Sequence, residues 1–402
     1  MRQMTRPCVA LLEMKWWGHH PTHLKLLAEV LLDLGCDVVC ACPAPEEMQS
    51  WLQRRWRPNW GRFVAIPFSS QPFGPLIERL LGGWNPRWLG ARLAMERLRR
   101  KVGRRADWVF IPMADEFVGS RLPPRWVDRI FPYAWSGRII HPSWYFNDKN
   151  WQSHVRVPRA KRCRRIYFLD DALAAEAQRV WGTPCEPFPE YAVMEMSEPR
   201  ESEVTRELRG RAAGRQIVGL FGVMDRRKGI HTMLAVAREM RSEPVFFAMI
   251  GHSPTPAAAA ELKEFEKSLT PDDAHNLWLH ETRLEDEAEF DGMLAAADLL
   301  FAVYQNFPYT SGILGKAAAM AKPIVVASGG AMERMVRRFE LGAVVNAGDV
   351  TAAAMAIRDL LSHPFGSGEG HREYAKLHSL EQIRTLLRRE VDETKGAMAG
   401  RD

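Results

Sequence analysis

The sequence predicts an α/β protein built from two Rossmann-like domains. Short apolar runs alternate with amphipathic segments along the chain, which is typical of βαβ units and a parallel sheet. Most of these runs are apolar at every position, as strands covered by helices on both faces require. The chain has 402 residues, more than a single hydrophobic core usually serves, so we expect two domains.

The first half contains six candidate strands and three candidate helices. We expect the strands at 8–14, 36–43, 62–68, 108–113, 138–142 and 165–170. We expect the helices at 22–34, 75–101 and 171–181. Residues 1–190 are therefore assigned to an N-terminal Rossmann-like domain. The Pro- and Glu-rich stretch that follows lacks a helical period, so residues 191–215 are interpreted as a linker.

The second half repeats this alternation with more regular spacing. Its strands are expected at 216–222, 245–251, 277–281, 298–304, 323–328 and 342–347. Its helices are expected at 229–240, 256–268, 285–296, 312–321, 331–339 and 350–361. Residues 216–365 form the second predicted domain. In the tail 366–402 we expect one amphipathic helix over 369–395, which crosses back to the first domain.

Composition excludes several classes of protein. No run approaches the roughly 20 apolar residues of a membrane span. The six cysteines form no CxxC pair, which predicts buried, reduced thiols, a cytoplasmic location and no metal site. No nucleic-acid-binding motif is present, so nucleic acid is not expected as a partner.

Basic charge is concentrated in the first half of the chain. Two stretches, 53–62 and 87–105, interleave arginines with tryptophans. Such a pattern suits an anionic membrane surface or a phosphorylated acceptor, and it fits a solvated basic helix face equally well. Peripheral attachment to the inner face of a membrane is therefore one of the expectations.

Four motifs follow one another in the second half. They are VGLFGVMDRRKGIHTMLAVA (218–237), FAMIGHS (247–253), LWLHETRLEDEAEFDGMLAAADLLF (277–301) and YTSGILGKAAAMAKPIVVASGGAMERMV (309–336). Their order and spacing resemble the donor domain of retaining GT-B glycosyltransferases, especially family four. The resemblance implies the GT-B fold, in which two Rossmann-like domains face a central cleft, and a nucleotide sugar as substrate with no resident cofactor.

The resemblance also implies which residues bind the donor. They are Gly222, Arg227, Lys228, Gly251, Arg283, Ser311, Gly312, Ile313 and Lys316. The N–H groups at 311–313 open a predicted helix and favour a phosphate. Lys228 adds a point charge and Arg227 a forked donor, and together they would stabilise the departing diphosphate. A surface lysine at residue 228 and a helix cap by Thr310 or Ser311 are the structural alternatives.

On the acceptor side the candidate residues follow strands of the first domain. Gly18 and His19 lie in a loop after the first strand, where three histidines without acidic partners make a poor metal site. His141 lies where the family often places a histidine that contacts the transferred sugar. Asp115 and Glu116 follow another strand end, the edge where α/β sheets bind ligands, and either could orient an acceptor hydroxyl. His141, Asp115 and Lys228 are the catalytic candidates.

Two departures from the family pattern affect the donor site. The family carries a pair of glutamates that would align with Pro308 and Lys316, and an ammonium cannot accept hydrogen bonds from ribose hydroxyls. The family's Gly-Arg is also altered, because Val223 follows Gly222. Lys316 could contact phosphate or pair with an acid, and Gln305 or Asn306 could supply polar contacts.

Three functions remain open from the sequence. The first is a metal-independent, retaining transferase that moves a sugar to a glycan or lipid-linked acceptor, as in polysaccharide biosynthesis. The second is a degenerate, non-catalytic GT-B protein that binds or scaffolds. The third is a GT-B epimerase, for which the sequence places no carboxylate pair.

Overall fold

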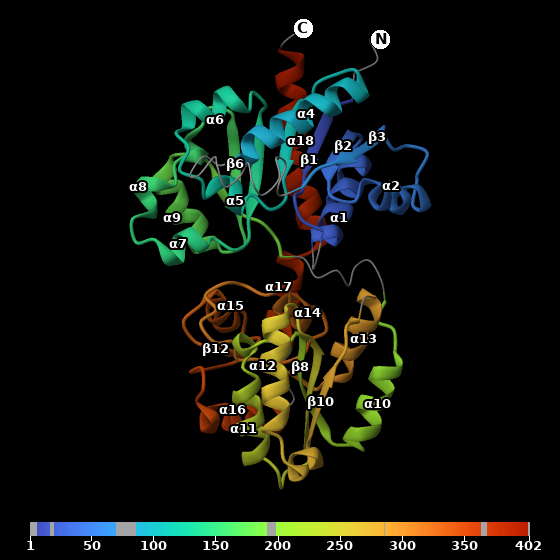
Figure 1. The fold of residues 1–402 in the computed structure, drawn as a ribbon, viewed down its shortest axis with the longest axis vertical. Coiled ribbons are helices and arrows are strands. Elements are labelled where there is room, and N and C mark those ends of the chain that lie inside the picture. The colour runs from blue at the N-terminus through green and yellow to red at the C-terminus, as the bar shows by residue number, and fades with distance from the viewer. Residues whose placement is uncertain are drawn as a thin grey trace. The chain divides into compact units, whose positions relative to one another are not determined.

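A computed structural model describes residues 6–16, 20–69, 86–190, 198–284, 286–362 and 368–400 (Figure 1). The chain forms two compact units. Unit 1 comprises Met1–Phe188 together with Glu381–Asp402, and unit 2 comprises Pro189–Leu380. All six cysteines are buried and free.

Unit 1 contains an alternation of parallel strands and helices. Its strands are β1 (Cys8–Leu12), β2 (Asp37–Cys42), β3 (Phe63–Pro67), β4 (Trp108–Ile111), β5 (Trp135–Ile139), β6 (Cys163–Phe168) and β7 (Cys185–Pro187). Its helices are α1 (His20–Asp33), α2 (Pro45–Arg54), α4 (Arg87–Val102), α5 (Asp115–Val118), α6 (Pro124–Ile130), α7 (Ser143–Asn147), α8 (Trp151–His154), η1 (Val157–Arg159), α9 (Asp171–Trp181) and α18 (Leu380–Ala399).

The strands of unit 1 form one parallel sheet in the order β3-β2-β1-β4-β5-β6-β7. Alternate residues of a strand point to opposite faces. One face packs Trp135, Ile166 and Phe168 against α4, α6 and α9. The intervening residues of the same strands therefore lie on the other face, which α18 covers.

Unit 2 has the same design. Its strands are β8 (Gln216–Val223), β9 (Val245–His252), β10 (Leu277–Glu281), β11 (Leu299–Ala302), β12 (Ile324–Ala327) and β13 (Gly342–Val345). Its helices are α10 (Glu203–Ala212), η3 (Arg226–Lys228), α11 (Ile230–Glu239), α12 (Pro256–Lys267), η4 (Pro271–His275), α13 (Glu287–Ala296), α14 (Gly312–Ala319), α15 (Ala331–Phe339), α16 (Val350–Ser362) and α17 (Glu369–Leu377).

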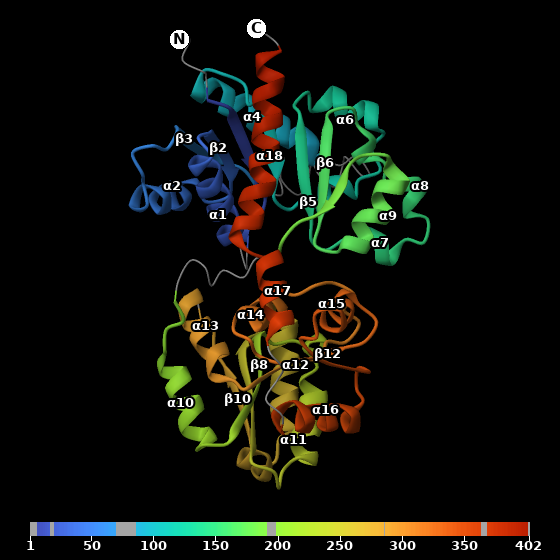
Figure 2. The same cartoon turned by 180° about the vertical axis from the view of Figure 1, so that it is seen from behind.

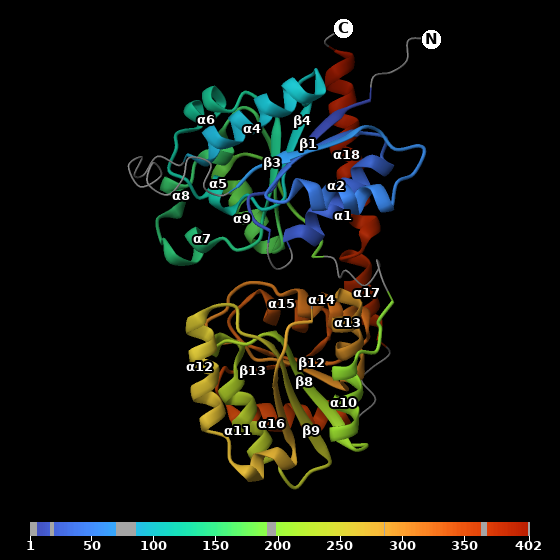
Figure 3. The ribbon, with the colours of Figure 1, turned by 45° about the vertical axis from the view of Figure 1, so that its right-hand side comes forward.

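The parallel sheet of unit 2 has the order β10-β9-β8-β11-β12-β13. Its two faces are covered by two hydrophobic cores, one with α11, α12 and α16 and the other with α10, α13, α14, α15 and α17. Helices α10 and α13 lie side by side (Figure 3). Both sheets are therefore doubly covered, as the apolar strands predicted.

The predicted strands and helices of unit 2 agree with the structure to within about three residues at each end. In unit 1 the expected helix at 75–101 corresponds to α4, and its residues up to 85 lie outside the described part. The segment 191–215 is more than a linker, because it contains α10. Ser202 caps α10 by accepting the N–H of Thr205, and few of its residues are apolar, which hid the helix in the sequence.

The expectation of one helix over 369–395 is wrong, because α17 ends at Leu377 and a new helix begins at Leu380. The ring of His378 stacks on Tyr374, with 4.1 Å between ring centroids, and its Nδ1 accepts the N–H of Glu190. These contacts hold the break in the helix. Helix α17 belongs to unit 2 and α18 to unit 1.

Helix α18 lies against the unit 1 sheet (Figure 2), and a buried carboxylate holds it there. Glu390 is fully buried, and its Oε1 accepts hydrogen bonds from Arg165 Nη1 at 2.6 Å, from Tyr167 Oη at 2.8 Å and from Ser136 Oγ at 3.2 Å. A buried charge is stable only when it is paired and hydrogen-bonded, so these three strand residues specify where α18 docks.

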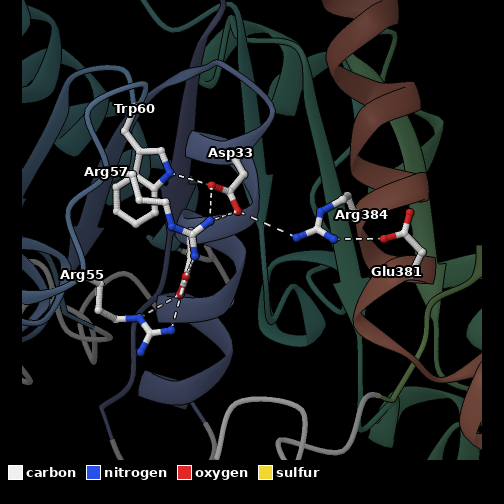
Figure 4. A network of polar contacts seen from close by, with 7 residues as sticks. Asp33, Arg55, Arg57, Trp60, Glu381 and Arg384 are labelled. Atoms are coloured by element: carbon white, nitrogen blue, oxygen red, sulfur yellow. Dashed lines mark hydrogen bonds and ion pairs between the residues drawn. The ribbon is translucent and has the colours of Figure 1, made fainter.

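A second polar network ties the start of α18 to α1 (Figure 4). Asp33 accepts hydrogen bonds from Arg57 and from the indole of Trp60, at 2.8 and 2.6 Å. Arg384 of α18 lies 3.8 Å from the same carboxylate and also pairs with Glu381. The C-terminal helix thus contacts the first helix of its unit as well as the sheet.

Candidate functional site

The carboxyl ends of β8 and β11 lie at the topological switch point of the unit 2 sheet. These strands are neighbours, but the chain continues from β8 to β9 on one side and from β11 to β12 on the other. Open α/β sheets bind ligands at such a switch point. The loop after β8 contains η3, and the loop after β11 leads into α14.

Lys228 lies at this position and is buried, with 8% of its surface exposed. Asp225 accepts its backbone N–H and so fixes the short η3 turn. Its Nζ donates a hydrogen bond to the Tyr304 hydroxyl at 2.7 Å and lies 4.0 Å from the centroid of that ring. The alternative of a surface lysine is therefore wrong.

Arg227 is held beside Lys228 but remains accessible. Its guanidinium lies 3.3 Å from Asp225 Oδ2 and 4.8 Å from the ring centroid of Phe307. Its carbonyl accepts the N–H of Gln305, which joins the two loops. Gln305 contributes a backbone contact here, and the neighbouring Asn306 is exposed with a positive φ of 50°.

Gly251 is required by the packing of the strand ends. A Cβ on Gly251 would lie 1.6 Å from the carbonyl oxygen of Gly222, which itself has a φ of 103°. No side chain fits at such a distance, so the glycine at the end of β9 keeps the ends of β8 and β9 together. The two predicted glycines therefore shape the edge of the sheet.

The N-terminus of α14 is open. Ser311 is the N-cap residue, yet its side chain makes no capping hydrogen bond, and a Cβ placed on Gly312 would meet nothing within 4 Å. Thr310 is buried, and within the described residues its hydroxyl has no hydrogen-bond partner. The alternative of a simple side-chain cap is therefore wrong, and the N–H groups at 311–313, beside the open space at Gly312, are in a position to bind an anion.

The side chain of Lys316 is buried and pairs with two acids of α13. It is 4% exposed, and its Nζ forms ion pairs with Glu287 at 2.6 Å and with the fully buried Asp291. Burial raises the pKa of Asp291, while the positive charge of Lys316 opposes that rise. Of the two alternatives for Lys316, the structure shows the pairing with acids, which joins α14 to α13, and its contact with the donor stays a prediction.

Arg283 is exposed in the loop after β10, beside the end of β9. Burial lowers the pKa of His252, and the positive charge of Arg283 lowers it further. The imidazole of His252 and the exposed guanidinium of Arg283 thus lie near the same edge of the sheet as Lys228. Asp225 follows β8 and Glu281 ends β10, so this edge is not purely basic.

In unit 1 the structure brings two of the predicted residues together. The carboxylate of Asp115 accepts the N–H of His141 at 2.6 Å and that of Ile140 at 3.1 Å. Burial raises the pKa of Asp115 to about 6, against the lowering effect of these amide donors. The carboxylate holds the loop after β5, and the side chain of His141 is exposed at its start.

Glu116 has a structural role. It forms ion pairs with Lys15 at 2.6 Å and with Arg87 at 2.7 Å. Burial raises its pKa, but the hydrogen bond from Lys15 and the charge of Arg87 outweigh this and hold the pKa below its ordinary value. Gly18 and His19 lie outside the described residues.

Several partners could not be recognised from the sequence. Tyr304 orients Lys228, and Glu287 with Asp291 neutralises Lys316. In unit 1 the buried Glu13 lies 2.9 Å from Nδ1 of His20, and Arg138 lies 3.1 Å from Nδ1 of His23. Arg138 is 115 positions from His23 and could not be recognised as its partner, whereas Glu13 lies close to His20 in the sequence. Across the described ranges, no three His, Cys, Asp or Glu residues gather as a metal site would require.

The fold is that of the GT-B glycosyltransferases. Sucrose-phosphate synthase from Thermosynechococcus elongatus matches 98% of this chain over 100% of its own, with a TM-score of 0.67 at 18% identity. The match to Anabaena HepE, solved with UDP and glucose, covers 96% of this chain and 100% of HepE, with a TM-score of 0.68 at 14% identity. The match to trehalose 6-phosphate synthase from Burkholderia multivorans covers 98% of this chain and 99% of that protein, with a TM-score of 0.64 at 12% identity.

The second unit carries the sequence signature of this class. Residues 215–363, which make up most of unit 2, match the family described as Glycosyl transferases group 1. The narrower resemblance to family four stays a prediction. A search of curated proteins gave no match. In the described parts of the chain, no helix has the length and apolar content of a membrane span.

Proposed function

We propose that the protein transfers a sugar from a nucleoside diphosphate donor to a hydroxyl of a glycan or lipid-linked acceptor. The observation that carries this proposal is the pairing of a buried cation with an open helix N-terminus at one switch point. Lys228 is fixed by Tyr304 after β8, and the amides at 311–313 begin α14 after β11. Both groups favour a diphosphate.

These groups act most strongly when the sugar leaves. Charge develops on the diphosphate as the glycosidic bond breaks, and fixed donors in a site shielded from water stabilise that charge without reorganisation. Arg227 adds an accessible guanidinium beside Lys228. In this proposal Lys228, Arg227 and the α14 amides neutralise the leaving group in place of a metal ion, and no resident cofactor takes part.

On the acceptor side we assign His141 to contact the transferred sugar and Asp115 to position it. Asp115 uses its carboxylate to hold the backbone N–H groups of residues 140 and 141. It therefore acts through the loop that presents His141. Retention of anomeric configuration, polysaccharide synthesis and a cytoplasmic location at a membrane face belong to the same proposal.

Binding is the first test. Isothermal titration with UDP, GDP and ADP should give at least one tight ligand, with UDP the first choice because Anabaena HepE is solved with UDP. Lys228→Ala should weaken that ligand about tenfold or more, since a charge-assisted hydrogen bond contributes about 1.5–3 kcal/mol. Lys263→Ala, at an exposed lysine of α12, is the matched control. Absence of binding by all three nucleotides would overturn the proposal.

Transfer is the second test. Incubation with a nucleotide sugar and a mixture of glycan and lipid-linked acceptors should release nucleoside diphosphate, and EDTA should leave the rate unchanged. The anomeric configuration of the product, read by NMR, decides between retention and inversion. Tight nucleotide binding without transfer to any acceptor would support the alternative below.

One observation favours a non-catalytic GT-B protein. Lys316 stands where the family carries a carboxylate, and it is fully engaged with Glu287 and Asp291. Ribose hydroxyls would then need another acceptor. Sugar transfer by the purified protein, lost in Lys228→Ala, would remove this alternative.

A further inference from the structure

Helix α4 exposes apolar side chains on its outer face. Trp88, Ala91, Met95 and Leu98 are buried in the core of unit 1. On the outside, Leu89 and Leu93 are 42% and 43% exposed, although a solvated helix face carries polar residues.

The same face of α4 carries unpaired positive charge. Leu89, Leu93, Arg97 and Arg100 follow one another at steps of four, four and three residues, which places them on one side of a helix. Arg97 and Arg100 are exposed and form no ion pair within the described residues. The one acidic residue of α4, Glu96, is engaged by Arg99 and Tyr133.

Helix α6 extends this surface. It packs beside α4 (Figures 1 and 3), and Arg92 of α4 donates to the carbonyls of Arg129 and Ile130 at its end. Trp126 of α6 is 37% exposed, with the guanidinium of Arg129 5.8 Å from its ring centroid. Arg125 is exposed as well. The acid of α6, Asp128, accepts the backbone N–H groups of Lys161 and Arg162.

We propose that this α4–α6 face, formed by Leu89, Leu93, Trp126, Arg97, Arg100 and Arg125, docks on an anionic lipid bilayer. Leucines and a tryptophan enter the boundary between headgroups and acyl chains, while arginines pair with lipid phosphates. Charge complementarity selects this occupant, because the face combines apolar side chains with arginines whose charge is offset by no carboxylate among the described residues. This deepens the membrane location included in the proposed function by naming the surface that docks, and vesicle binding tests it separately from sugar transfer.

Co-sedimentation of the full chain with vesicles tests the proposal. The wild type should sediment with vesicles of phosphatidylcholine and phosphatidylglycerol, remain in solution with phosphatidylcholine alone, and be released by high salt. Arg97→Gln/Arg100→Gln should bind anionic vesicles about thirtyfold more weakly, given the contribution of each arginine near a charged surface. Leu89→Gln/Leu93→Gln should bind about tenfold more weakly.

Two exposed arginines elsewhere supply the matched control. Arg206→Gln/Arg388→Gln removes the same charge from α10 and α18 and should bind like the wild type. Because all six substituted residues are exposed, melting temperatures should be unchanged. Absence of binding to anionic vesicles, or equal losses in the control and the α4 variants, would overturn the proposal. Light scattering that shows a dimer abolished by the leucine substitutions, with vesicle binding intact, would assign the face to self-association instead.

Discussion

The ammonium of Lys228 is fixed by the hydroxyl of Tyr304, with 2.7 Å between Nζ and Oη. The two residues are 76 positions apart, at the ends of the neighbouring strands β8 and β11. An ammonium has three donors, so this one bond orients the charge and leaves donors for a ligand. The aromatic residue thus determines where the cation at the switch point lies.

Tyr304→Phe should weaken nucleoside diphosphate binding by about fivefold, because it removes one hydrogen bond worth about 1 kcal/mol and leaves the ring in place. Titration calorimetry of Tyr304→Phe, Lys228→Ala and the double variant measures the coupling. The double variant should bind no more weakly than Lys228→Ala alone. Fully additive losses would show that Tyr304 does not act through Lys228.

Gly312→Ala should separate binding from stability. A methyl group at Gly312 meets no protein atom within 4 Å, and alanine is favoured over glycine in a helix, so the melting temperature should hold or rise. The same methyl group enters the opening at the start of α14, so affinity for the nucleotide should fall about tenfold. Gly210→Ala in α10, also in open space, is the control and should leave affinity unchanged. Unaltered affinity in Gly312→Ala would place the phosphate elsewhere.

Lys316→Met should lower the free energy of unfolding by about 3–5 kcal/mol, because it leaves the buried carboxylate of Asp291 without its partner. Replacing both residues, in Lys316→Met/Asp291→Leu, should recover most of the loss. Lys263→Met, at an exposed position, should stay within about 0.5 kcal/mol. Urea unfolding measures all three. A small effect of Lys316→Met would mean that the ion pair is not buried in solution.

The acids around Lys316 also explain why a lysine, and not the family's glutamate, fits at position 316. A glutamate restored at position 316 would lie beside the carboxylates of Glu287 and Asp291, and like charges in a buried site repel strongly. We therefore expect Lys316→Glu to be destabilising on its own.

Asp115 should make stability depend on pH between about 4 and 6. Its pKa is raised to about 6 in the folded protein, so in this interval the folded state binds more protons than the unfolded state. The contribution of Asp115 is then most favourable below pH 4 and declines as the pH rises to 6, by at most about 3 kcal/mol.

Urea unfolding from pH 4 to pH 7 measures this decline. Asp115→Asn should flatten the profile across the interval. Asp128→Asn removes another carboxylate that accepts two backbone N–H groups and should keep the wild-type profile. An unchanged profile in Asp115→Asn would show that another group is responsible.

The sequence by itself determined the alternation of strands and helices and the segment that contains Lys228. These features depend on local patterns. Strands are apolar over a few residues, Gly182 ends α9 in a left-handed conformation, and Asp170 caps its start. The order of motifs in the second half also placed the amides at 311–313 at a helix start, as the structure has them.

Only the tertiary structure decided which charges are available to a ligand. Lys316 meets acids from α13, Glu116 meets Lys15 and Arg87, and Lys228 meets Tyr304. Each pair joins different helices or strand ends, and helix packing alone brings such residues within hydrogen-bonding distance. Residue type and spacing fix what a side chain can do, whereas its neighbours in space fix whether its charge is already neutralised.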